Sequence, residues 1–168
     1  MTQCKYHLFQ TPVGWIALLG SGKRLCRLSL QPTPEEALDE LGPDLERSAN
    51  DPDGFAGMQS CLERYLKGDG GALDEIELDL SGSPPFFSAA WEACRRIPSG
   101  ETRSYAWLAA EAGSPLAVRA AGQAMARNRF PLIIPCHRVV ASNGDLRGYG
   151  AGGLTVKAEL LERERAGA

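Results

Sequence analysis

Residues 133–140 read Ile-Ile-Pro-Cys-His-Arg-Val-Val, an apolar run that enters a proline, presents a cysteine beside a histidine, and leaves through two β-branched residues. The apolar runs on both sides predict short buried strands. Pro135 fixes its own φ and biases Ile134 towards extended geometry, so we expect a rigid turn that holds Cys136. This part of the chain therefore predicts two strands joined by a rigid, reactive turn.

Cys136 and His137 are candidates for a nucleophile and its base, because a cysteine reacts as its thiolate and an imidazole can help to form one. The alternative is a buried cysteine in a core strand, the usual fate of a lone cysteine among apolar residues. His137 and Arg138 favour the reactive site, since neither belongs in an apolar core without partners. Neighbours on an extended chain point to opposite sides, so a bridging water is as plausible as a direct bond. The adjacency argues mildly against a papain-like protease, whose histidine is distant in sequence.

The residues before this turn predict a helix-turn-helix. A linker at 81–85 precedes a helix at about 87–96. Ser104 then caps a helix over 105–112, and Ser114-Pro115 is typical of an N-cap followed by proline, which predicts a second helix to about Arg127. This second helix is rich in alanine and carries Arg119. Such a helix can approach DNA or simply pack tightly against another helix.

After the reactive turn, Asn143-Gly144 is a strong turn signal. Residues 148–153 formally match a dinucleotide-binding GxGxxG, but no strand–helix–strand unit follows. We expect a loop that lines a pocket and begins a last helix over 154–165.

The first half predicts a small α/β unit. Weak alternation and turns over residues 3–30 predict a three-stranded antiparallel sheet. Thr33 is the expected N-cap of a short helix, residues 42–54 a loop, 55–66 a second helix, and 76–80 an edge or half-buried strand. Cys4, His7 and Cys26 could gather round a zinc ion, but three ligands without tight spacing favour core thiols and a surface histidine instead.

Composition limits the protein's class. The chain has 168 residues, and no apolar run approaches the length of a membrane span. The N-terminus has no signal-peptide pattern, and five cysteines without close spacing predict free thiols in a reducing cytoplasm. Residues 1–83 hold seven basic and fourteen acidic side chains, whereas 84–168 hold eleven basic and seven acidic ones. The basic half favours a polyanionic partner, with uneven surface charge as the alternative.

The Pro-Cys-His-Arg-Val-Val hexapeptide resembles the signature of the O6-alkylguanine-DNA alkyltransferases. The resemblance covers Arg96–Glu164 and thins before Pro84. Its other motifs are Ile97-Pro98-Ser99-Gly100-Glu101-Thr102, Ser104-Tyr105, Ala117-Val118-Arg119-Ala120, Asn128, Gly152-Gly153-Leu154, Lys157 and Leu160-Leu161.

This resemblance implies an α+β protein. Residues 1–80 would form a ribonuclease H-like domain with a small antiparallel sheet, and 84–168 a helical winged helix-turn-helix domain that carries the cysteine. The implied activity is single-turnover repair of O6-alkylguanine, and also of O4-alkylthymine, in double-stranded DNA. We further expect a monomer without a cofactor and without a metal among its site residues, although some relatives carry a structural zinc in the region of Cys4 and Cys26.

The resemblance also assigns roles to residues. Cys136 would be the nucleophile and alkyl acceptor, His137 would take its proton through water, and Glu164 would orient His137. Tyr105 would donate a proton to the departing guanine and contact DNA. Among the residues that would bind DNA, Arg119 would be the finger that fills the vacated space, Ser114 and Ser142 would contact phosphates, and Asn128 would tie the helix to the reactive turn. The substrate pocket would be lined by Met125, Pro135, Val139, Tyr149, Gly150 and Ala151.

Two other functions are compatible with parts of this pattern. A non-catalytic protein that binds alkylguanine and only flags it would lack the cysteine, whereas Cys136 is present. An unrelated Cys-His hydrolase would turn over repeatedly on an ester or amide without DNA.

Overall fold

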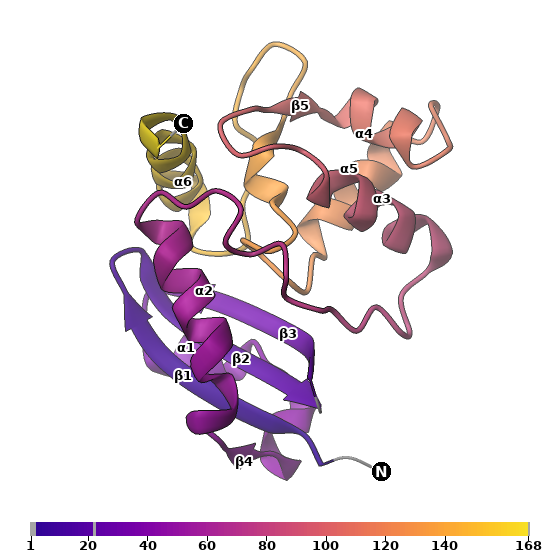
Figure 1. Cartoon of the computed structure of the whole chain (residues 1–168). Helices are drawn as coiled ribbons and strands as arrows, with labels where there is room; N and C mark the ends of the chain where they lie inside the picture. The colour runs from indigo at the N-terminus through magenta and orange to yellow at the C-terminus, as the bar shows by residue number, and fades with distance from the viewer. Residues whose placement is uncertain (1–2, 22, 168) are drawn as a thin grey trace. The chain divides into compact units, whose positions relative to one another are not determined.

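The structure is a computed structural model that describes residues 3–21 and 23–167. The chain divides into two compact units, one ending at Asp79 and the other beginning at Leu80 (Figure 1). Within the described ranges, no helix is both long and apolar enough to cross a membrane.

The first unit is built on the predicted meander. Strands β1 (Lys5–Thr11), β2 (Gly14–Ser21) and β3 (Arg24–Gln31) are antiparallel, and a short β4 (Ala49–Asn50) joins β1 in parallel, which gives the order β3-β2-β1-β4. Gly14 lies in the β1–β2 turn with φ +138°, and a Cβ there would meet the Gln31 carbonyl oxygen at 2.9 Å. Glycine is therefore required at this turn by both its conformation and the close backbone approach.

A helix covers each face of this sheet (Figure 1). Helix α1 (Pro34–Asp39) begins at the predicted cap, where the Thr33 side chain accepts a hydrogen bond from Glu36 N, and Ala37 packs on Ala17 and Leu19. Helix α2 (Ala56–Leu66) lies on the other face and buries Leu62, Tyr65 and Leu66. Because both faces are covered, residues 16–19 of β2 are all buried.

Two predictions for this unit were wrong. The expected loop at 42–54 contains two 3-10 turns, Pro43–Arg47 and Asp53–Phe55, as well as β4. The expected strand at 76–80 makes a single bridge between Leu78 and Leu25, flanked by bonds from Leu25 N to Glu77 O and from Asp79 N to Leu25 O. A turn closed by Ser83 N on Leu80 O redirects the chain there, which leaves too few residues for a ladder.

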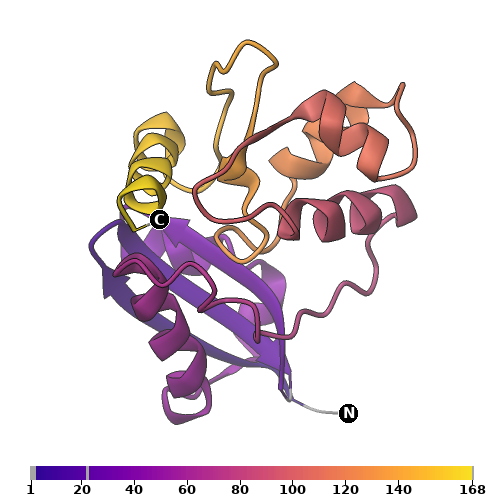
Figure 2. The same cartoon turned by 45° about the horizontal axis from the view of Figure 1, so that its top comes forward.

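The second unit is mainly helical (Figure 2). Its core includes Trp91, whose indole N–H donates to Ala124 O at 2.8 Å and so joins α3 (Pro85–Arg95) to α5 (Val118–Ala126). Helix α3 buries Ala90, Trp91 and Cys94. The elements of this unit are α3 (Pro85–Arg95), β5 (Arg103–Ser104), α4 (Tyr105–Glu111), α5 (Val118–Ala126), β6 (Val139–Val140), which pairs in parallel with β5, and α6 (Gly153–Gly167).

The second helix of the helix-turn-helix begins later than predicted. Ser104 caps α4 as expected, but Ser114 does not cap α5, which begins at Val118. Ser114 N instead donates to Ala109 O, and Gly113 N donates to Ala110 O with Gly113 at φ +96°. This is the Schellman arrangement that ends α4, so Ser114 belongs to the preceding helix.

Candidate active site

The backbone at Cys136 forms a short 3-10 turn, and the segment before it is not a strand. Residues 136–138 form a 3-10 turn that leads into β6, whereas Ile133 lies in a turn that follows Leu132 at φ +75°. Cys136 N donates to Ile134 O, and Arg138 N donates to Pro135 O. The predicted strand before the cysteine was therefore wrong, because these local bonds close the backbone on itself.

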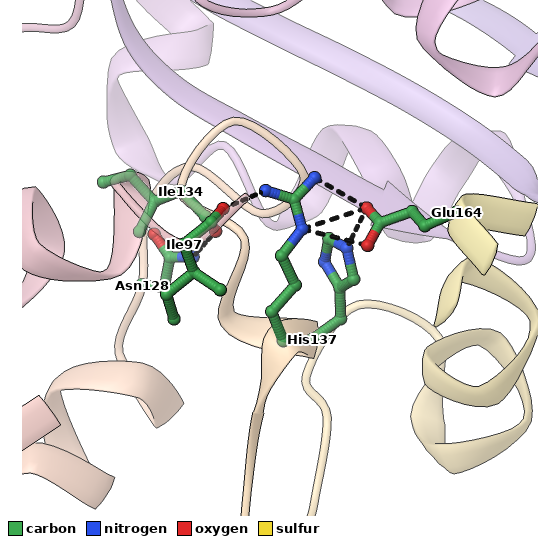
Figure 3. A network of polar contacts seen from close by, with 6 residues as sticks. Ile97, Asn128, Ile134, His137 and Glu164 are labelled. Atoms are coloured by element: carbon green, nitrogen blue, oxygen red, sulfur yellow. Dashed lines mark hydrogen bonds and ion pairs between the residues drawn. The ribbon is translucent and has the colours of Figure 1, made fainter. Parts of the chain in front are cut away.

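Asn128 ties the end of α5 to this turn. Its side-chain amide donates to Ile134 O at 2.8 Å, and its side-chain oxygen accepts from Phe130 N at 2.9 Å. Figure 3 shows Asn128 beside Ile134. Asn128, two residues after the end of α5, thus fixes the backbone two residues before the cysteine.

A buried polar network lies behind the cysteine. His137 Nε2 is 2.7 Å from Glu164 Oε2, and the guanidinium of Arg138 donates to both carboxylate oxygens. Arg138 Nη1 also donates to Ile97 O at 2.6 Å, which anchors the network to the end of α3 (Figure 3). The exposed fractions of His137 and Glu164 are 0% and 5%. The network brings together His137 and Glu164, which are 27 residues apart, from the turn and from α6.

The hydrogen bond to Glu164 determines how His137 can act. A carboxylate only accepts, so Nε2 carries the proton in the neutral imidazole and Nδ1 is the basic nitrogen. Burial lowers the pKa of His137, and Glu164 partly offsets this effect. The imidazole is therefore neutral near pH 7 and competent to accept a proton.

Glu164 is the charged member of the network. Burial alone would raise the pKa of its carboxyl, but hydrogen bonds from His137 and Arg138 outweigh burial and hold that pKa well below its usual range. An ionised carboxylate is therefore already in place to stabilise an imidazolium.

Cys136 is a protonated thiol at rest, because burial raises its pKa. Asn128, the nearby Lys157 ammonium and backbone N–H groups oppose this effect. Lys157 is itself buried, and its Nζ donates to Val139 O at 2.9 Å. The surroundings thus favour the thiolate without forming it spontaneously, so a base is needed.

Cys136 and Tyr105 line one pocket of about 1,080 Å³. Tyr105 is the first residue of α4, and burial raises the pKa of its phenol, which keeps it a proton donor at neutral pH. The other lining residues are Val118, Arg119, Gly122, Met125, Ala126, Arg147, Gly148, Tyr149 and Gly150. A nucleophile and a proton donor therefore share one cavity.

The residues expected at the pocket divide into two groups. Met125, Tyr149 and Gly150 line it together with Arg119, whereas Pro135, Val139 and Ala151 are buried without lining it. Ser114 and Ser142 are both exposed, in the turn before α5 and in the loop after β6, and neither is among the residues that line the pocket.

Sequence reasoning named Arg138 and Lys157 but gave neither a role in the site, and it missed Arg147. A signal existed for Lys157, because 157, 160, 161 and 164 have the spacing of one buried helix face, and all four are buried. Lys157 and Glu164 lie on that face, and charged side chains at buried positions are expected to have polar partners. For Arg147, a loop residue, no such signal exists.

The residues considered for zinc do not converge. Cys4 packs against the cluster formed with α1, whereas His7 bonds Gln59 of α2 and stacks on Phe55, on the other face of the sheet. The expectation of a surface histidine was also wrong, since His7 is buried. Among the described residues, no group of three histidine, cysteine or acidic side chains is placed to hold a metal.

The comparisons with known proteins agree over both units. Residues 4–80 match the family model described as 6-O-methylguanine DNA methyltransferase, ribonuclease-like domain, and residues 85–166 match the DNA binding domain of the same description. A methylated-DNA–protein-cysteine methyltransferase from Mycobacterium bovis is 39% identical over 162 residues, which cover 96% of this chain and 92% of that protein. A constitutive one from Bacillus subtilis is 37% identical, covering 95% and 94%. The crystal structure of Mycobacterium tuberculosis OGT in complex with DNA aligns with a TM-score of 0.81 at 36% identity, covering 98% of this chain and 94% of that one.

Proposed function

The chain belongs to the 6-O-methylguanine DNA methyltransferase family, and from this membership and its pocket we propose that it repairs alkylated double-stranded DNA. It transfers the alkyl group of O6-alkylguanine, and also of O4-alkylthymine, to Sγ of Cys136. The observation that carries the assignment to Cys136 is that this thiol lines the pocket that Tyr105 also lines, and that the adjacent residue His137 is hydrogen-bonded to Glu164.

The proton must leave the thiol before the alkyl group can be transferred. His137 takes this proton at Nδ1 through a water, and Glu164 stabilises the imidazolium that results. The thiolate then attacks the alkyl carbon in one displacement: the S–C bond forms, the C–O bond breaks, and the electron pair stays on the guanine. Tyr105 supplies the proton that the departing guanine requires.

The product explains why each molecule acts once. A thioester intermediate would hydrolyse, but an S-alkyl thioether has no electrophilic carbonyl, and a thiolate is a poor leaving group. No other residue of the pocket is a second acceptor, since Cys136 is the one cysteine among its described lining residues.

Access to the lesion requires the base to leave the stack. Arg119 is exposed on α5 and lines the pocket, which suits it to fill the gap in the duplex. Ser114 and Ser142, both exposed, are proposed to contact phosphates. The excess of basic side chains in residues 84–168 supports a DNA partner for this unit.

The decisive experiment is the intact mass of the protein before and after incubation with a duplex that contains O6-methylguanine. We expect one added methyl group per molecule, lost in Cys136→Ala, which should still bind the lesion. Lesion binding by the wild type without a mass change would favour a flag protein. Repeated turnover of an ester without DNA would favour a hydrolase.

A monomer in the cytoplasm completes the proposal. The five cysteines are all free thiols, which agrees with a reducing compartment and with a reactive cysteine.

A further inference from the structure

Arg147 is a pocket residue for which the reaction above has no use. It lies in the loop between β6 and α6, which extends away from the helices of the second unit in both views (Figures 1 and 2). Arg147 lines the same cavity as Cys136 and Tyr105. Two arginines and no carboxylate are among the described residues that line it, so the cavity has a positive wall near the nucleophile.

The guanidinium of Arg147 is available to a ligand. In the part of the chain that the structure describes, it forms no hydrogen bond or ion pair, and the nearby Asp145 is held by Asn143 instead. Arg147 lines the pocket together with Tyr105, and its charge lowers the pKa of that phenol against the larger effects of burial and Cys136. An arginine with five unused donors is suited to an anionic oxygen pair.

The wall around Arg147 has room for more than a methyl group. Gly148 and Gly150 follow Arg147 by one and three residues in the sequence, and a Cβ built at either would meet no atom within 4 Å. A pocket of about 1,080 Å³ can therefore hold a base together with a substituted alkyl group on this side.

We propose that Arg147 determines specificity for O6-alkylguanine adducts whose alkyl group ends in an anion, such as a carboxylate. This inference rests on the proposed function. A carboxylate that leaves water for a partly apolar pocket is costly unless it is paired, and Arg147 supplies the pair in the pocket that Cys136 also lines.

The reaction with such an adduct is the same displacement. With O6-carboxymethylguanine, Sγ attacks the methylene carbon, the S–C bond forms, and the C–O bond breaks with its electrons left on guanine. The thiol proton goes to His137 and the guanine is protonated by Tyr105. The carboxylate is carried unchanged onto Cys136, where it remains beside Arg147.

The test is single-turnover kinetics with two adducts, O6-methylguanine and O6-carboxymethylguanine, each in duplex DNA and as the free base. Arg147→Gln should slow carboxymethyl transfer about tenfold on both substrates, while methyl transfer changes less than twofold, since a methyl group offers no charge to the exposed Arg147. Arg147→Lys should restore part of the loss. Arg96→Gln is the charge-matched control, because its side chain pairs with Glu111 outside the pocket, and it should leave the ratio of the two adducts unchanged.

The other outcomes each overturn the inference. Equal slowing of both adducts on duplex only would mean that Arg147 contacts a DNA phosphate. Equal slowing on the free bases as well would mean that it acts through Tyr105. Unchanged rates would make it a solvent-facing side chain. Failure of the wild type to transfer methyl at all would instead overturn the proposed function.

Discussion

Glu164 is the residue on which the buried network depends. It accepts hydrogen bonds from a guanidinium that is always charged and from an imidazole that is neutral at rest. Arg138 keeps the carboxylate ionised, and its own charge also lowers the pKa of His137. The arrangement thus stabilises an imidazolium while it forms, without making His137 so basic that it is protonated beforehand.

Replacement of Glu164 should therefore affect stability as well as rate. Glu164→Gln leaves Arg138 as a buried cation without a counter-ion, and we expect a loss of roughly 3 kcal/mol in the free energy of unfolding at pH 7, together with slower alkyl transfer. Urea unfolding and single-turnover rates would measure the two effects. Glu162→Gln, on the same helix but paired with exposed Arg165, should change stability by less than about 0.5 kcal/mol.

The same network predicts acid lability. The pKa values of His137 and Glu164 are both lowered in the folded state, so the unfolded chain binds protons more readily. Stability should fall as pH drops through about 6.5, the ordinary value for histidine, and again below about 4.3, that for glutamate. In Glu164→Gln the second decrease should be smaller. Urea midpoints between pH 8 and 3 would show this, and parallel curves for both proteins would contradict it.

Tyr105 should matter for chemistry and not for folding. Tyr105→Phe keeps the ring at the start of α4 but removes the proton donor, so transfer should slow about 10²-fold on duplex and free base alike. Tyr6→Phe, in the first unit, is the matched control and should react normally. A Tyr105→Phe variant with wild-type rates would assign the proton to water.

At the scale of the elements, two serines show what sequence reasoning could and could not decide. Ser104 and Ser114 both precede predicted helices, and only Ser104 caps one. Ser114 is used by the Schellman end of α4, because Gly113 adopts φ +96°. A serine before a helical pattern is a local signal for an N-cap. Whether that serine caps the next helix or belongs to the end of the preceding one cannot be read from the local signal.

Arg119 on α5 is the proposed finger, and the effect of replacing it should depend on the duplex. A finger stabilises only the flipped state, so Arg119→Ala should slow repair in double-stranded DNA by one to two orders of magnitude, or ~1–3 kcal/mol. The free modified base should react nearly normally, and Arg119→Lys should recover part of the loss. Arg127→Ala, at the end of α5 and outside the pocket lining, is the control. Equal slowing on both substrates would make Arg119 part of the pocket.

The loop after β6 should control the size of the alkyl group. A Cβ at Gly150 meets no atom within 4 Å, so Gly150→Ala should fold normally yet narrow the pocket. Transfer of a benzyl group should slow several-fold relative to methyl, measured as a ratio of single-turnover rates. Gly144→Ala is the control. Because Gly144 has φ +87°, this replacement should lower the free energy of unfolding by about 1 kcal/mol and leave the ratio of benzyl to methyl transfer rates unchanged.

At the scale of the whole molecule, the meander of the first unit and most helices of both units follow from local patterns, whereas the site does not. Periodicity cannot place Glu164 against His137, since 27 residues separate them, and only the family resemblance suggested that pair. Nor could it find Arg147, which lines the cavity from a glycine-rich loop whose conformation no local pattern predicts. Contacts between distant segments are set by packing, which a linear pattern does not contain.

The five thiols of the chain have very different surroundings. Cys94 is fully buried on α3, and burial raises its pKa well above that of a free thiol, so it stays protonated and inert. Cys26 donates to Asp79, and Cys61 lies beside the Arg64 guanidinium on the exposed side of α2. Of the described cysteines, Cys136 alone combines a pocket, a base in the adjacent residue and groups that favour its thiolate.

A single cysteine should therefore be sufficient for repair. A variant with Cys4, Cys26 and Cys61 changed to serine and Cys94 to alanine keeps Cys136 and its network, so it should still take up one methyl group per molecule from excess O6-methylguanine duplex. Cys94→Ala removes a buried sulfur and should cost about 1 kcal/mol of stability without changing stoichiometry. Mass spectrometry of the intact protein and of its peptides measures the extent and the position of the methyl group. Less than one methyl per folded molecule, or methyl on another cysteine in the wild type, would show that the acceptor has been misassigned.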